Sequence, residues 1–317
     1  RGFRGAGAPE APPRGAVLDW YFGRAPGGEV TLTIADSAGR VLRRFTNDTA
    51  RDGEREGAGP GAGDAGRGVG VAPRWEADTA LAGAGAHRFA WDLRWPAPRL
   101  VDDAVVYYGY AGGAPATPGT YRATLSAGGW SETRSFRVRE DPRIDAGRED
   151  LEAQTALLRK IAGRIEEIHD AIRKARDVRS QVRAALARAE DLADRPPGVD
   201  SVRALGRALS DSLTAVEHAL IQTKTRSGQD PINFEAKLWS YYAHLAGTVV
   251  SADAAPTAGE RRRLTDLEAD WSAVRERLER ALGEPVDAFD RALETGGVPA
   301  VVVPPDHSRH PADTEAP

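Results

Sequence analysis

The chain has 317 residues, 41% of them hydrophobic and 28% charged, which is typical of a soluble globular protein with room for two domains. Its formal net charge of −4 does not indicate a nucleic-acid or anionic-membrane partner. The absence of cysteine excludes disulfides, thiolate metal sites and cysteine nucleophiles, and no run of 18 apolar residues predicts a membrane span.

Residues 1–13 are rich in Gly, Ala, Pro and Arg and predict a linker from a preceding segment. Methionine is absent, even at position 1, so we expect the chain to be a fragment or a processed product of a larger protein. A signal peptide is not visible, but a C-terminal part of a longer chain would lack one in any case.

Residues 14–141 have the two-residue period of β-strands. In the stretch EVTLTIAD, Val30, Leu32 and Ile34 alternate with threonines, and Asp36 and Gly39 supply a turn before RVLRRF returns as a second strand. Further strands are predicted in AVLDWYF, HRFAWDLR, GTYRATLSA and WSETRSFRVRE. These short strands favour an antiparallel β-sandwich, interrupted by a Gly- and Asp-rich segment, residues 47–74, that we predict to be a disordered insertion.

Residues 145–296 change to helical spacing. Apolar residues recur every three or four positions from Leu151 to Ala189, which predicts one long helix with Asp145 as its N-cap. Three more amphipathic segments follow, and together they predict an antiparallel four-helix bundle or coiled coil. Thr257 and Glu260 have the spacing of a capping box, Pro285 is expected to interrupt the last segment, and residues 297–317 predict a flexible tail.

The stretches EVTLTIADSAGRVLRRF, GAHRFAWDLRWPAP, PGTYRATLSAGGWSETRSFRV and DPRI resemble the FlgD-type Ig-like module. They are most similar to its version at the C-terminus of bacterial BNR/sortilin (VPS10)-like β-propeller proteins, often labelled glycosyl hydrolase. The stretch DPINFEAKLWSYYAHLAGTVVSADAAPTAGE is similar to the helical tail of that family. The resemblance covers roughly residues 12–303 and implies an Ig-like sandwich followed by a helical bundle.

The resemblance also implies a secreted or periplasmic location and a partner in the same protein, namely a β-propeller before Arg1. Any sialidase-like or ligand-binding face would lie in that propeller. The Asp-box motif of such propellers has the form Ser-x-Asp-x-Gly-x-Thr-Trp. The nearest match here, ADSAGRVLRRF, has two residues between Asp36 and Gly39 and no Thr-Trp after them. No functional residue of the family is therefore carried over to this chain.

Glu166 and His169 form the Glu-x-x-His spacing that di-iron bundles use. Such a site needs a second copy of the motif and two further glutamates, and the sequence contains no second copy. Both residues flank the apolar seam of the long helix, so we expect them on a solvated helix face. The sequence predicts no metal and no cofactor.

The aromatic segment from 95 to 110 is the remaining candidate site, with Trp95, Tyr107, Tyr108 and Tyr110 as candidate binding residues. Aromatic side chains can stack on sugars, and a glycosidase would in addition need two carboxylates roughly 5–9.5 Å apart. Asp92, Asp102 and Asp103 lie near the aromatics, although a core Trp91 and two aspartates in a polar loop explain the pattern as well. We favour docking of this segment inside the protein over an exposed patch that binds carbohydrate or peptide.

The two folding patterns contain no catalytic constellation, and the resemblance implies a preceding propeller. Together they lead us to expect a non-catalytic accessory and scaffolding region that supports or orients the propeller and mediates association. Two alternatives stay open: a carbohydrate- or peptide-binding module, and a region that stabilises a glycoside hydrolase whose active site lies upstream. The sequence leaves open whether the full-length parent is an active hydrolase.

Overall fold

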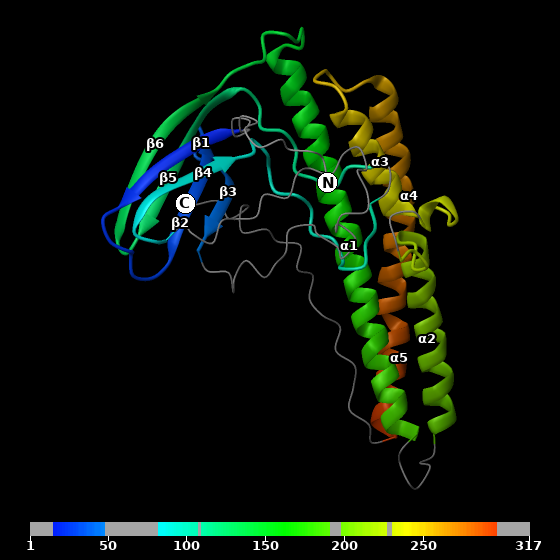
Figure 1. Ribbon diagram of the computed structural model, residues 1–317. Coiled ribbons are helices and arrows are strands. Elements are labelled where there is room, and N and C mark those ends of the chain that lie inside the picture. Colours follow the sequence, from blue (N-terminus) through cyan, green and yellow to red (C-terminus); the bar gives the residue numbers. More distant parts are fainter. Residues whose placement is uncertain (1–14, 48–81, 107–108, 191–197, 227–229, 297–317) are drawn as a thin grey trace. The chain divides into compact units, whose positions relative to one another are not determined.

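The computed structural model describes residues 15–47, 82–106, 109–190, 198–226 and 230–296 (Figure 1). The chain has mixed β and α content and divides into two compact units. The sheet unit contains the described residues of 15–47, 82–96 and 115–144, and the helical unit contains those of 97–114 and 145–296. The predicted boundary of 14–141 therefore assigns residues 97–114 differently from the compact units of the structure.

Six strands form two antiparallel sheets in the sheet unit. The smaller sheet pairs β1 (Ala16–Phe22) with β4 (Gly85–Trp91). The larger sheet has four strands, in the order β3 (Val41–Thr46), β2 (Val30–Asp36), β5 (Gly119–Ala127) and β6 (Trp130–Val138). The predicted hairpin is confirmed, because β2 pairs with β3 and the Asp36 carboxylate accepts the backbone N–H groups of Ala38 and Arg40 in the turn.

Both sheets contribute to one hydrophobic core. Val30, Leu32 and Ile34 of β2 are buried, as their alternation with threonines predicts. Trp91 of β4 is fully buried and lies edge-on to Tyr121 of the larger sheet at a centroid distance of 5.3 Å. The predicted core position of Trp91 is therefore confirmed.

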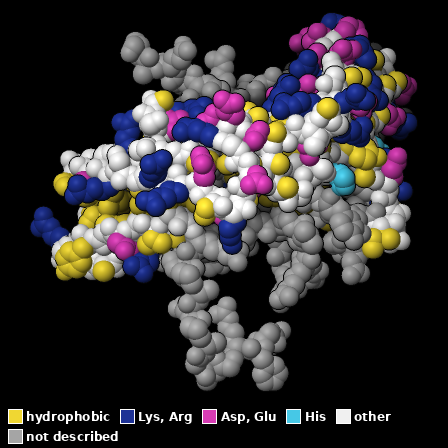
Figure 2. All heavy atoms as spheres, turned by 90° about the horizontal axis from the view of Figure 1, so that it is seen from above, with side chains coloured by type: hydrophobic (Ala, Val, Ile, Leu, Met, Phe, Trp, Pro, Cys, Tyr) yellow, Lys and Arg dark blue, Asp and Glu magenta, His cyan; other side chains and the backbone are white. Residues whose placement is uncertain are grey.

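Five α-helices and one short 3-10 turn form the helical unit. They are α1 (Arg148–Glu190), α2 (Val199–Leu220), the turn Asp230–Ile232, α3 (Leu238–Val250), α4 (Ala258–Leu282) and α5 (Glu284–Thr295). Among the described helices, none is both long enough and apolar enough to cross a membrane. Acidic and basic side chains are intermixed on the face seen in Figure 2, so this face does not present charge of one sign.

The helix ends follow local sequence signals in most places. The predicted capping box is confirmed: the Glu260 N–H donates to the Thr257 hydroxyl, and the Thr257 N–H donates to the Glu260 carboxylate. The interruption at Pro285 is confirmed as well, because α4 ends at Leu282 and α5 begins at Glu284. The prediction of Asp145 as the N-cap of α1 is wrong, since the helix begins at Arg148 and the Asp150 carboxylate accepts the Gly147 N–H.

The helices do not alternate in direction as an antiparallel four-helix bundle requires. Both α2 and α3 run opposite to α1. Along α1, Arg176 contacts Glu217 of α2 and the later Arg179 contacts the earlier Thr214. In the same way Gln154 contacts Val249 of α3, and the later His169 contacts the earlier Trp239. By contrast, α4 runs in the same direction as α1, because Lys160 pairs with Glu268 and, further along both helices, Glu167 accepts from Trp271. Figure 1 shows α3 and α4 beside the N-terminal half of α1, and α2 and α5 beside its C-terminal half.

Three helices meet closely at Gly206 of α2. A Cβ atom at this position would lie 2.9 Å from side-chain atoms of both Leu186 of α1 and Phe289 of α5. Phe289 and Gly206 are buried, so the small residue permits a close approach of helices in this part of the core.

Candidate functional site

Residues 97–114, which we call the strap, are the segment in which sequence reasoning placed most candidate site residues. In sequence the strap lies between β4 and β5, but its described residues, 97–106 and 109–114, belong to the helical unit. The two chain ends at its base are held together within the sheet unit, where the Ala116 N–H donates to the Leu93 carbonyl at 2.7 Å. The strap is therefore a long loop with paired ends that packs on helices.

Close backbone contact fixes the C-terminal part of the strap on α3. The Tyr110 N–H donates to the Ala243 carbonyl at 2.8 Å. Gly109 lies so near the helix that a Cβ atom there would be 2.8 Å from the Ala243 carbonyl carbon, a distance that side chains do not tolerate. Glycine at 109 is thus required by the docked position of the strap.

Tyr110, one of the predicted binding residues, is only 4% exposed. Its hydroxyl donates to the Gly113 carbonyl at 2.5 Å, which closes the strap on itself. Together with Leu158, Ile165 and Ala246 of α1 and α3, Tyr110 lines a cavity that is too small to hold a water molecule. Tyr110 therefore contributes to the core of the helical unit.

His169 is fully buried, so the prediction of a solvated helix face is wrong for this residue. Its Nδ1 accepts the backbone N–H of Val101 at 3.2 Å, and its ring lies edge-on to Trp239 at a centroid distance of 5.0 Å. An accepting Nδ1 requires the neutral tautomer with hydrogen on Nε2. The helical spacing of apolar residues predicts that the side of α1 with His169 faces solvent, but the strap covers this side.

The surroundings of His169 oppose its protonation. Burial is the largest cause, the positive charges of Arg173 and Arg176 add to it, and together they lower the pKa of His169 to about 3 despite the opposing charge of Asp103. Glu166, the other half of the predicted pair, accepts from Arg99 of the strap at 2.6 Å. Within the described ranges, no three His, Asp or Glu side chains gather as a metal site would require.

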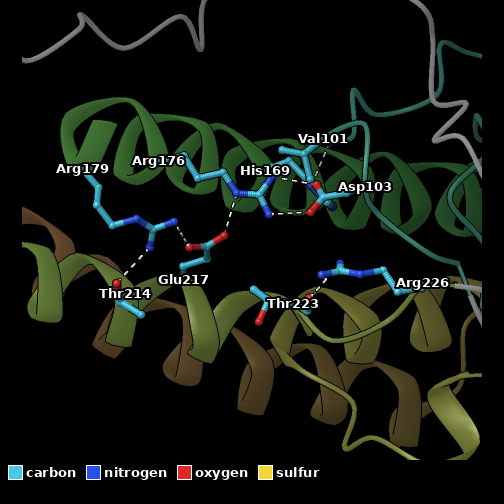
Figure 3. A network of polar contacts seen from close by, with 9 residues as sticks. All are labelled: Val101, Asp103, His169, Arg176, Arg179, Thr214, Glu217, Thr223 and Arg226. Carbon is cyan, nitrogen blue, oxygen red and sulfur yellow. Dashed lines mark hydrogen bonds and ion pairs between the residues drawn. The ribbon is translucent and has the colours of Figure 1, made fainter. Parts of the chain in front are cut away.

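A chain of charged side chains continues from the strap to α2 (Figure 3). Arg176 donates to both carboxylate oxygens of Asp103, at 2.7 and 2.8 Å, and through Nε to Glu217 at 2.6 Å. The second Glu217 oxygen lies 2.5 Å from the Arg179 guanidinium, which also donates to Thr214 at 3.1 Å. The hydrogen bonds from Arg176 hold the pKa of Asp103 below its usual range and raise the pKa of Arg176.

The chemistry open to this network is limited by its internal pairing. Glu217 is only 4% exposed and both its oxygens face guanidinium groups, and both oxygens of Asp103 accept from Arg176. A general acid or base must exchange a proton near its working pH with a substrate within hydrogen-bonding reach. Carboxylates engaged in this way hold elements together, and the geometry is that of a clamp between the strap, α1 and α2.

The other predicted site residues lie in different places. Trp95 belongs to the sheet unit, where the Arg40 guanidinium lies over its ring at 5.0 Å. Asp92 accepts the Arg94 N–H within the same local turn, and Asp102 is exposed on the strap. Tyr107 and Tyr108 lie outside the described residues, as do the glycine-rich insertion and the C-terminal tail. Of the four predicted aromatic residues, the structure thus describes Trp95 in the sheet unit and Tyr110 in the helical unit.

A groove that sequence reasoning did not single out runs between α3 and the start of α4. Its volume is about 340 Å³, and its lining residues are Tyr241, His244, Leu245, Thr248, Gly259, Glu260 and Arg263. The signal for it is present in the sequence, because the four α3 residues are spaced as one helix face. The Arg263 guanidinium lies over the Tyr241 ring at 5.6 Å and closes one side of the groove.

Comparison with known proteins identifies no relative: no family model, no curated protein and no solved structure significantly matches this chain.

Proposed function

We propose that this chain is a non-catalytic accessory and scaffolding region of a larger secreted or periplasmic protein, and that it mediates association. In this proposal the sheet unit is an Ig-like β-sandwich of the FlgD type. The helical unit is a bundle in which α2 and α3 succeed one another beside α1, as do α4 and α5. The shared core of the two sheets and the helix contacts are consistent with these assignments.

One observation carries the proposal. Three side chains of the described helical unit that could in principle exchange protons, His169, Glu217 and Asp103, bind the chain's own backbone and guanidinium groups. Active sites keep such groups available to a substrate, whereas scaffolds use them to hold elements in place. Tyr110 is buried and its backbone N–H bonds to Ala243 of α3, which supports a role in packing within the chain for this residue and not in ligand binding.

The resemblance of the sequence to BNR/sortilin-like proteins supplies the rest of the proposal, namely a β-propeller before Arg1. An immunoblot of source cells and medium with an antibody to this chain tests it. We expect a band much heavier than 33.9 kDa, found in the medium or periplasm. A band at 33.9 kDa would contradict the propeller part of the proposal.

A second experiment tests the absence of catalysis. The purified chain is incubated with a panel of chromogenic glycosides, and the same chain after heat unfolding serves as control. We expect equal, background rates from both samples. Turnover that is present only in the folded chain would overturn the scaffolding proposal.

A further inference from the structure

The strand β6 (Trp130–Val138) is the edge of the four-stranded sheet. It pairs along all nine residues with β5, and among the described strands none pairs with its other side. An edge strand leaves a row of backbone N–H and C=O groups that another strand can bind. The question is therefore which strand fits this edge.

Side chains of β6 are exposed on both faces of the sheet. Trp130, Glu132 and Arg134 share a face with the buried β5 residues that lie opposite them, yet all three are exposed, and Trp130 is 48% exposed. Glu132 and Arg134 form an ion pair with one another along the strand. The core face of the sheet thus extends beyond the area that the smaller sheet covers.

The sequence of β6 is complementary to itself. If two copies of the strand are placed antiparallel about a two-fold axis at Thr133, Glu132 of each faces Arg134 of the other. The same register places Trp130 opposite Phe136 and Ser131 opposite Ser135. Aromatic pairs, small hydroxyl pairs and opposite charges are the cross-strand neighbours that stabilise antiparallel sheets.

Neighbouring registers lack this complementarity. If one strand slides by a single residue against the other, side chains that point to opposite faces of the sheet come to lie opposite one another, so this register is excluded. A shift of the two-fold axis by one residue in either direction keeps the faces but sets Arg134 opposite Arg134, or Glu132 opposite Glu132. Like charges directly opposite one another destabilise a strand pair, so one register is favoured.

We propose that β6 is a self-association edge, at which two copies of this chain pair antiparallel about Thr133 and join their four-stranded sheets into one. A two-fold interface of this kind uses the same surface of both copies. The inference rests on the association part of the proposed function and gives it a surface. It involves only the sheet unit.

Charge reversal tests the register. The mass of the full chain is measured by sedimentation equilibrium up to millimolar concentration, and we expect it to rise from 33.9 kDa toward twice that value. Glu132→Arg and Arg134→Glu each set like charges opposite one another and should weaken association by about tenfold or more. The double variant, Glu132→Arg with Arg134→Glu, should restore it.

The thermal unfolding of each variant verifies that the sheet is intact. Since these side chains are exposed, we expect unchanged midpoints. A wild-type chain that stays monomeric at all concentrations would overturn the inference. A dimer that the single variants do not weaken, or that the double variant fails to restore, would overturn it as well.

Cysteine crosslinking locates the axis, because the chain contains no cysteine of its own. In the proposed dimer the two Thr133 residues face one another with Cα atoms about 4.5–5.5 Å apart, within reach of a disulfide. Thr133→Cys should therefore form a disulfide dimer under mild oxidation. Thr124→Cys is the matched control, since Thr124 lies opposite Thr133 on β5 and the two hydroxyls share one hydrogen bond at 2.9 Å.

Two Thr124 residues would lie three strand spacings apart, about 14 Å, which is beyond disulfide reach. Equal crosslinking of the two variants, or none in Thr133→Cys, would contradict the proposed axis. The outcomes also separate this inference from the scaffolding role. If the chain is monomeric and does not hydrolyse glycosides, only the self-association at β6 is contradicted. If it is dimeric and hydrolyses glycosides, only the scaffolding role is contradicted.

Discussion

The sheet unit and the helical unit each contain an arginine that donates hydrogen bonds to both carboxylate oxygens of one aspartate. In the sheet unit Arg88 of β4 donates to Asp19 of β1 at 2.8 and 2.9 Å, with side chains that are 66% and 55% exposed. In the helical unit Arg176 holds Asp103 at 2.7 and 2.8 Å and then continues to the buried Glu217. The two pairs have nearly the same geometry and different surroundings.

The difference teaches that burial, more than geometry, decides what such a pair contributes to stability. Water and salt screen the exposed pair, and its side chains lose entropy when they are fixed. The Arg176–Glu217 ion pair is shielded, with side chains that are 29% and 5% exposed, so loss of one partner leaves a buried charge without compensation. The following substitutions are ordered from the largest expected effect on unfolding to the smallest.

Glu217→Ala is expected to have the largest effect. It removes the carboxylate that binds both Arg176 and Arg179, and a broken buried ion pair destabilises by about 3–5 kcal/mol. Urea unfolding at pH 7 measures the loss. Asp211→Ala, an exposed carboxylate on the same helix, is the control, and a Glu217→Ala variant no less stable than this control would contradict the expectation.

The second prediction concerns pH and His169. Because its pKa is lowered from 6.5 to about 3 in the folded chain, the unfolded chain binds more protons between these values. The stability that His169 contributes is therefore complete above pH 6.5 and is lost as the pH falls toward 3, at about 1.4 kcal/mol per pH unit. Between pH 6.5 and pH 5 we expect a loss of about 2 kcal/mol.

His169→Asn separates this effect from all other titrations. The Asn carbonyl oxygen can accept the Val101 N–H in place of Nδ1, but it does not titrate. Urea unfolding at several pH values should give a shallower decline for the variant than for the wild type between pH 6.5 and 5. Asp103 contributes with the same sign only at lower pH, since its pKa is held below 3.8. Parallel curves for the two proteins would refute the assignment.

Two glycines of the helical unit allow a comparison between a closely packed position and an open one. Gly206→Ala should destabilise by about 1 kcal/mol or more, because overpacking against Leu186 and Phe289 exceeds the gain in helix propensity. Gly163→Ala on α1 meets no atom within 4 Å and should stabilise by about 0.5–1 kcal/mol. Thermal unfolding of both variants measures the opposite signs. The same sign for both would mean that the helices near Gly206 are less closely packed than described.

Asp19→Asn is expected to have the smallest effect. The lowered pKa of Asp19 comes from its hydrogen bonds with Arg88, but both side chains are more than half exposed, so water and salt screen the pair. The urea midpoint of this variant should match that of the wild type within error. A clear loss of stability would contradict the conclusion that an exposed arginine–aspartate pair contributes little.

Local signals in the sequence predicted the elements of this fold well. Alternation located the hairpin of β2 and β3, and Thr257 with Glu260 located the start of α4. These features depend on residues within a few positions of one another, so they can be read from one stretch of chain. The N-cap of α1 was missed because Asp150 supplies the carboxylate from inside the helix instead of Asp145 before it.

The candidate site could not be predicted in the same way. Its contacts join Val101 to His169 and Arg176 to Glu217, positions far apart in sequence with no shared period. Charged residues on a helix usually indicate a solvated face, and nothing local distinguishes Glu217 from its exposed neighbours.

The position of the strap in the chain has a consequence for synthesis on the ribosome. Tyr110 bonds to Ala243, so the strap emerges more than 100 residues before the helix that receives it. At a synthesis rate of about 5–20 residues per second, several seconds or more pass before α3 is made, and Tyr110 stays unburied during this time. During that interval the nascent sheet unit can complete its six described strands, since β6 ends at Val138, while the strap stays accessible to chaperones.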